Sequence, residues 1–82
     1  MDRSELLDRA RRNPAGLRFT EACALAEAYG WVLTNRRRGG SHVIFKRPGV
    51  MQLINLQMGE NGMAKAYQVR QLVRAIEQEG AR

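Results

Sequence analysis

The only histidine of the chain, His42, lies within a basic segment, RRRGGSHVIFKRPG, at residues 36–49. This segment holds five arginines and lysines and no acidic residue. Histidine is the side chain whose charge changes most readily near neutral pH. Because neighbouring cations disfavour the imidazolium form, His42 would stay neutral near pH 7 and could serve as a general base.

The proton that such a base would take in a basic groove is that of a ribose 2′-hydroxyl. The resulting alkoxide would attack the adjacent phosphodiester, while arginine or lysine stabilises charge in the transition state. DNA lacks the 2′-hydroxyl, so this chemistry would select RNA. The general acid is left open. Lys46 is four strand residues from His42, about 13 Å away at ~3.3 Å per residue, which is too far to share the reacting atoms with it directly. Lys65 and Tyr67, at the start of the last expected helix, are the candidates.

A structural role for His42, as a histidine that fills a half-buried strand position, is the alternative. Side chains alternate between the two faces of a strand. His42, Ile44 and Lys46 therefore share one face of the expected strand, and Val43 and Phe45 share the other. The second pair is the better core pair, which predicts that His42 lies on the open face.

Other chemistries fit the chain less well. Cys23 lies on an expected core face with no evident base, so we interpret it as a packing residue. One histidine and one cysteine without a nearby carboxylate make a poor metal site, and we expect neither a metal nor a small-molecule cofactor. The glycines of NRRRGGS do not form a phosphate loop, because no helix follows them. Trp31 is interpreted as a packing residue, with stacking on a base as the alternative.

The charge of the chain indicates a polyanionic partner, most often nucleic acid. The net charge is +6, and no acidic residue occurs between Glu27 and Glu60. Lys65, just before the last expected helix, is a further phosphate candidate, because double-stranded-RNA-binding domains place such lysines there. The basic candidates for phosphate contact are Arg36, Arg37, Arg38, Lys46, Arg47 and Lys65.

The length of 82 residues supports one domain. A single cysteine excludes an intramolecular disulfide. The N-terminal residues MDRSELLDRARR show no signal peptide, and no apolar run approaches the ~20 residues needed to span a bilayer. We therefore expect a soluble cytoplasmic protein without membrane contact.

Helices are expected at residues 2–12, 20–29 and 66–79. Ser4 is the expected N-cap of the first helix and Thr20 that of the second, and Gly30 is placed to end the second in a left-handed conformation. The last helix carries one apolar stripe with the spacing i, i+3, i+4 and i+7. The stripe consists of Val69, Leu72, Val73 and Ile76.

Strands are expected at residues 31–36, 41–46 and 50–57, joined by turns at residues 37–40 and 47–49, with a glycine-punctuated loop at 58–65. The chain is thus predicted to be α+β, with the order α-β-β-β-α and a short helix in front. Two helices would cover one face of a three-stranded antiparallel sheet and leave the other face open to a ligand. We divide the chain into an N-terminal extension, 1–17, and a domain, 18–82.

The segment around His42 resembles a known family. Gly40, Ser41 and His42 are followed by an apolar strand (VIF), a basic turn, a third strand and a terminal amphipathic helix that opens with YQVRQL. This arrangement resembles the HicA family, the small toxins of bacterial toxin–antitoxin pairs. The resemblance covers residues 19–80, roughly three quarters of the chain.

The resemblance implies a fold similar to a double-stranded-RNA-binding domain and an activity that cleaves mRNA and arrests translation. In the family the histidine of the Gly-Ser-His motif is catalytic, and this role carries over to His42. Gly40 and Ser41 of the motif are then expected beside the RNA. The resemblance also implies a HicB-type antitoxin as partner, which covers the toxin and often binds operator DNA, and a reaction without metal.

The chain departs from the family pattern at two places. Many members carry a second histidine beside the first, where this chain has Val43, and some carry one near the end of the third strand, where it has Asn55 and Gln57. These departures leave the motif histidine in place and predict a weaker nuclease. Two other functions stay open: a non-catalytic RNA-binding module and a protein-interaction subunit whose basic face meets an acidic partner.

Overall fold

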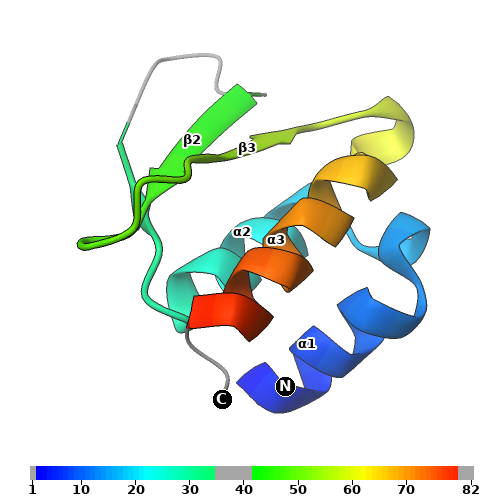
Figure 1. Cartoon of the computed structure of the whole chain (residues 1–82). Coiled ribbons are helices and arrows are strands. Elements are labelled where there is room, and N and C mark those ends of the chain that lie inside the picture. The colour runs from blue at the N-terminus through cyan, green and yellow to red at the C-terminus, as the bar shows by residue number, and fades with distance from the viewer. Residues whose placement is uncertain (1, 35–41, 80–82) are drawn as a thin grey trace.

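The computed structural model describes residues 2–34 and 42–79. Its elements in chain order are α1 (Arg3–Arg12), α2 (Phe19–Ala28), β1 (Val32–Leu33), β2 (His42–Lys46), β3 (Ile54–Gln57) and α3 (Ala66–Glu79). Short 3₁₀ turns lie at Pro14–Gly16 and Glu60–Gly62. The strands form one antiparallel sheet in the order β1-β2-β3 (Figure 1). The predicted α+β class and element order are confirmed.

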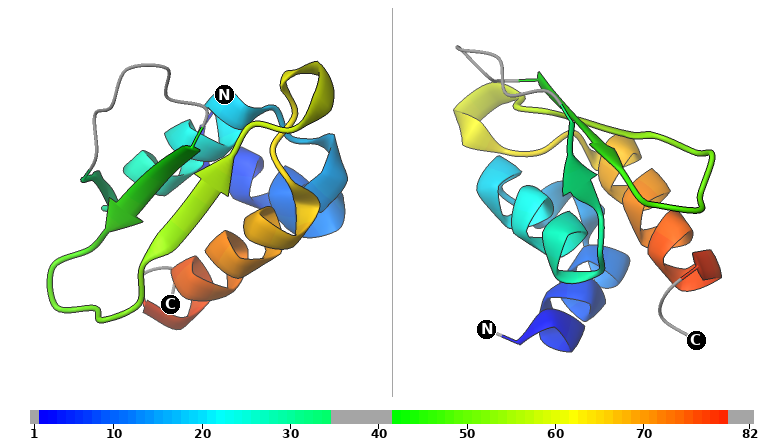
Figure 2. Two further views of the ribbon diagram at one scale, coloured as in Figure 1. Left: turned by 90° about the horizontal axis from the view of Figure 1, so that it is seen from above. Right: turned by 90° about the vertical axis from the view of Figure 1, so that its left-hand side faces the viewer.

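All three helices lie on the same side of the sheet, in two layers (Figures 1 and 2). α2 packs against β1 and β3, and α3 packs against β3. α1 packs against α2 and α3 on the side away from the sheet. Among the described residues the opposite face of the sheet carries no helix, as predicted from two amphipathic helices on one face. Within the described residues, no helix is long and apolar enough to cross a membrane.

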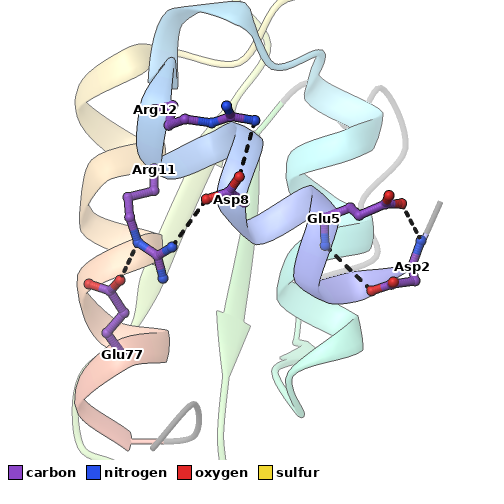
Figure 3. A network of polar contacts seen from close by, with 6 residues as sticks. All are labelled: Asp2, Glu5, Asp8, Arg11, Arg12 and Glu77. Carbon is purple, nitrogen blue, oxygen red and sulfur yellow. Dashed lines mark hydrogen bonds and ion pairs between the residues drawn. The ribbon is translucent and has the colours of Figure 1, made fainter.

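Asp2, and not Ser4, caps the first helix. The Asp2 carboxylate accepts hydrogen bonds from the backbone N–H groups of Ser4 (2.7 Å) and Glu5 (3.4 Å), and the Glu5 side chain accepts one from the Asp2 N–H (Figure 3). This reciprocal arrangement is a capping box. The expectation for Ser4 was wrong because a carboxylate two residues earlier accepts both bonds, while the Ser4 hydroxyl itself donates to Asp2 (2.7 Å).

The N-terminal helix contributes directly to the hydrophobic core. Its apolar stripe, Leu6, Leu7 and Ala10, is buried in the same cluster as residues of α2, α3 and the sheet. Arg11 forms an ion pair with Glu77 of α3 (2.6 Å), which ties the outer helix to the last one (Figure 3). The N-terminal extension is therefore packed onto the rest of the chain as a third layer.

The second helix begins one residue earlier than expected. Arg18, not Thr20, occupies the N-cap position, and its backbone N–H donates to the carboxylate of Glu21 (2.9 Å). Because the helix begins at Phe19, the Phe19 side chain is buried in the core. A start at Thr20 would not place Phe19 in the helix. The helix ends as expected, since Gly30 adopts a left-handed conformation with φ of +90°.

The two outer strands are shorter than predicted. β2 ends at Lys46, and Pro48 has no N–H for a ladder, so residues 50–53 have no strand to pair with. β3 therefore begins only at Ile54, opposite Phe45. β1 spans only Val32–Leu33, and Trp31 and Thr34, which were expected in it, lie outside the strand. Residues 35–36 of the expected strand and the turn at 37–40 lie outside the described residues.

Candidate functional site

His42 is the first residue of β2 and is exposed on the open face of the sheet. The burial of β2 follows the predicted alternation, since Phe45 is buried in the core and Lys46 is exposed. The antiparallel register places His42 opposite Gln57, the last residue of β3. By the alternation along β2, the His42 imidazole leaves the sheet on the side away from the helices, whereas the Gln57 side chain, at the end of the edge strand, is bonded to Gln68 of α3.

Gln57 is connected to the last helix by a compact hydrogen-bond network. Its backbone N–H donates to the side-chain oxygen of Gln68 (2.7 Å), and its own side-chain oxygen accepts from Gln68 Nε2 (3.1 Å). Gln68 Nε2 also donates to the hydroxyl of Tyr67 (3.3 Å). The network joins the cross-strand partner of His42 to the first turn of α3.

Gln68 is almost completely enclosed, with 4% of its surface exposed, and it is the one buried polar side chain in the described part of the chain. The burial of Gln68 is explained by the unpaired edge of the sheet next to it. β3 is an edge strand, so the N–H of Gln57 has no strand partner on that side. A buried N–H without an acceptor is costly, and the Gln68 side chain supplies the acceptor.

The start of α3 brings a cation and a phenol to the same end of the sheet. The backbone carbonyl of Lys65 accepts from the N–H groups of Gln68 (3.0 Å) and Val69 (3.1 Å), which fixes Lys65 just before the helix. The Lys65 side chain is exposed, and Tyr67 is 53% exposed. Of the two acid candidates weighed from the sequence, Tyr67 is the one bonded into the network of Gln57.

The remaining predicted RNA-binding residues fall into two groups. Lys46 ends β2, about 13 Å from His42 along the strand, and Arg47 follows it. Lys46 is exposed, whereas Arg47 is half-buried beside Gly30. The structure thus separates these cations from His42. The other predicted residues lie outside the described residues: Arg36, Arg37, Arg38, Gly40 and Ser41.

Cys23 and Trp31 are placed by packing. Burial, and to a lesser degree the charge of Glu27, raises the pKa of Cys23 to about 11, so the thiol stays protonated at neutral pH and is a poor nucleophile. Trp31 is 1% exposed, so it cannot stack on a base. Within the described residues, 2–34 and 42–79, no group of three or more His, Cys, Asp or Glu side chains could hold a metal ion.

His42 and Tyr67 were predicted from the sequence as site residues, whereas the roles of Gln57 and Gln68 in the hydrogen-bond network were not. One signal could have found Gln68: with Leu72 and Ala75 it stands at i, i+4 and i+7, so a polar residue occupies a position in the buried face of α3. A buried glutamine needs partners, which points to a polar contact at the start of this helix. Gln57 was named only as a position where some members of the resembled family carry a histidine, and its bonds depend on where α3 lies, which the sequence does not show.

The chain is an α+β protein in which a histidine on the open face of a three-stranded sheet lies next to a buried glutamine network. Comparison of the chain with protein-family models, curated proteins and solved structures found no match. The resemblance to the HicA family therefore rests on the residues of the chain itself.

Proposed function

We propose that the chain is the toxin of a type II toxin–antitoxin system and a metal-independent mRNA endoribonuclease, similar to HicA toxins, with His42 as its acid/base residue. One observation supports the proposal above all: the single histidine is exposed on the sheet face that carries no helix within the described residues, in a chain of net charge +6. A strand of RNA can reach the imidazole there without displacing any helix.

In this mechanism the neutral imidazole of His42 takes the proton of a ribose 2′-hydroxyl. The 2′-oxygen attacks the adjacent phosphorus, and the bond from phosphorus to the 5′-oxygen breaks. The products are a 2′,3′-cyclic phosphate and a 5′-hydroxyl. Lys65, exposed at the same end of the sheet, is suited to stabilise the additional negative charge on the phosphate oxygens.

The proposed partner is a HicB-type antitoxin. An inhibitor of this reaction has to cover the open face around His42, and acidic side chains could take the place of RNA phosphates next to Lys46 and Lys65. Such an antitoxin should stop cleavage at equimolar concentration. A complex whose contacts avoid His42 and both lysines would argue against this mode of inhibition.

The deciding experiment compares cleavage of a labelled RNA by the wild type and by His42→Ala, with EDTA present and antitoxin absent. We expect the wild type to give a 2′,3′-cyclic phosphate product and the variant to lose at least about 10²-fold in rate, the usual contribution of a general base. Because His42 is exposed, the variant should unfold at the same temperature as the wild type. A fully active variant would refute the role of His42.

A non-catalytic RNA-binding module is the second candidate function. It is favoured by two exposed lysines that are far apart, Lys46 at the end of β2 and Lys65 just before α3, which could contact two separate phosphates. In that case wild type and His42→Ala both shift the mobility of the RNA and neither yields product. If neither protein binds RNA, the remaining candidate is a protein-interaction subunit with an acidic partner.

A further inference from the structure

We propose that Tyr67 is the general acid of the reaction, the group that protonates the departing 5′-oxygen, and that Gln68 is the residue that positions it. This inference rests on the proposed ribonuclease function and assigns the proton donor that His42 alone does not supply. It is carried by the hydrogen-bond network that joins Tyr67, Gln68 and Gln57 at the end of the sheet where His42 lies.

The network places the phenol at the end of the sheet where His42 lies. His42 and Gln57 are a cross-strand pair, on strands about 4.8 Å apart. The Gln57 side chain bonds to Gln68 Nε2 (3.1 Å), and the same nitrogen bonds to the Tyr67 hydroxyl (3.3 Å). Two hydrogen bonds therefore link the strand partner of His42 to Tyr67. In the proposed complex the phosphodiester to be cleaved lies across this end of the sheet, between the imidazole and the phenol.

The orientation of the Gln68 amide is fixed by chemistry. The backbone N–H of Gln57 can only donate, so the Gln68 atom 2.7 Å from it must be the oxygen. The amide nitrogen then faces Tyr67 and donates to its hydroxyl, which leaves the phenolic proton free to be donated elsewhere. Among the residues that the structure describes, this proton has no acceptor. Tyr67 is 53% exposed, and its hydroxyl accepts a hydrogen bond from the protein. The hydroxyl is therefore arranged to donate its proton to a ligand.

The proton balance of the reaction is complete with these two residues. His42 accepts the proton of the 2′-hydroxyl while the 2′-oxygen forms its bond to phosphorus. The bond to the 5′-oxygen breaks, the electron pair stays on that oxygen, and the phenolic proton of Tyr67 is transferred to it. The phenolate then regains a proton from water, and the imidazolium of His42 releases its proton to solvent.

Lys65 is the competing candidate for this role. Its ammonium group is exposed and is not part of the network, so it can follow a phosphate oxygen as a mobile point charge. Stabilising phosphate charge needs only proximity, whereas proton transfer to one leaving oxygen needs a fixed donor. The bonded hydroxyl of Tyr67 meets the second requirement better.

The test uses two RNA substrates, one natural and one with sulfur in place of the bridging 5′-oxygen at the cleavage site. A thiolate leaves without protonation, so the sulfur substrate bypasses the general acid. We expect Tyr67→Phe to lose about 10²–10⁴-fold in kcat on the natural RNA and to match the wild type on the sulfur substrate. His42→Ala should be slow on both substrates, because the base is still required.

Tyr29→Phe is the matched control. It removes the same hydroxyl from the only other tyrosine, which is half-buried at the end of α2 with Arg3 4.8 Å from its ring centre. This variant should cleave natural RNA as the wild type does. If Tyr67→Phe also cleaves it at the wild-type rate, or is equally slow on the sulfur substrate, the assignment of Tyr67 is wrong.

Gln68→Met tests positioning, since methionine has a similar length and makes none of the three bonds. We expect kcat on natural RNA to fall at least tenfold with KM unchanged, and the sulfur substrate to restore the rate. A loss of packing alone would slow both substrates alike and would refute the positioning role. If the wild type cleaves neither substrate, the proposed ribonuclease function itself fails, which is a separate outcome from a failure of Tyr67.

Discussion

Glu21 shows at the scale of one residue how a surface carboxylate can organise two elements. It accepts a hydrogen bond from Arg9 of α1 (2.9 Å) and another from the backbone N–H of Arg18 at the start of α2 (2.9 Å). These two bonds lower the pKa of Glu21 below its ordinary value of 4.5. The bond from Arg9 lowers it more than the bond from Arg18. The charged form is therefore favoured in the folded protein.

The lowered pKa of Glu21 predicts a pH-dependent contribution to stability. A carboxylate with a lower pKa in the folded state stabilises the fold above the pKa of the unfolded chain, and this contribution is lost as the pH falls through the folded value. Glu21→Gln should lower the melting temperature by a few degrees at pH 7. The difference from wild type should shrink progressively below pH 4.5, the ordinary value of this group.

Thermal unfolding between pH 3 and pH 7 checks this prediction. Glu27→Gln, an exposed glutamate on the same helix, is the control and should melt close to the wild type throughout. A difference between wild type and Glu21→Gln that stays constant down to pH 3 would mean that the ion pair with Arg9 contributes nothing.

At the scale of elements, α1 decides how the two sheet-packing helices are covered. α2 and α3 bury one side against the sheet, and their other side would be open to water without a third helix. Leu6, Leu7 and Ala10 close that side. The Arg11–Glu77 and Arg9–Glu21 pairs lie at the margins of this contact. These partly exposed ion pairs contribute less than the apolar burial, which provides most of the attachment.

Leu7→Ala should therefore destabilise the whole domain as a core substitution does. Leu7 is 5% exposed, and removing such a leucine costs about 2–5 kcal/mol of unfolding free energy. Urea unfolding at pH 7 measures this cost as a lower midpoint. Arg12→Ala, on the exposed side of the same helix, should stay within about 0.5 kcal/mol of wild type. An unchanged midpoint for Leu7→Ala would show that α1 is not cooperatively folded with the rest.

At the scale of the whole molecule, the net charge of +6 favours a polyanionic partner but does not determine where one would bind. Exposed cations occur in different parts of the molecule: Lys46 at the end of β2, Lys65 just before α3, and Arg12 on α1, where it pairs with Asp8 (3.0 Å; Figure 3). The salt dependence of RNA binding can separate these parts.

Phosphate contacts release counterions, with a slope of about −0.7 per contact for a single strand. Lys46→Ala and Lys65→Ala should each reduce the slope of log K against log salt by about 0.7. Arg12→Ala changes the net charge by the same amount and should leave the slope unchanged. Fluorescence anisotropy with a labelled single-stranded RNA between 50 and about 300 mM salt measures all three. Equal changes for all three variants would mean that binding follows the net charge and not the sheet face.

Local patterns determined much of this protein. The helix predicted at residues 66–79 has the bounds of α3 in the structure. Its apolar stripe could be recognised because the buried face of a helix follows from the spacing of apolar residues along the chain. The alternation along residues 42–46 placed His42 on the exposed face for the same reason, since side chains in a strand must alternate. The α+β class and the element order followed from these local periods.

Tertiary structure decided what depends on residues far apart in the chain. β3 is short because β2 ends at Lys46 and Pro48 follows, which leaves residues 50–53 without a strand to pair with. The β propensity of residues 50–53 does not decide its length. The placing of α1 depended on an uncovered side of α2 and α3 that no local pattern reveals. The network of Gln57, Gln68 and Tyr67 arises only because the edge of β3 meets the first turn of α3, and an unpaired N–H at that edge needs an acceptor.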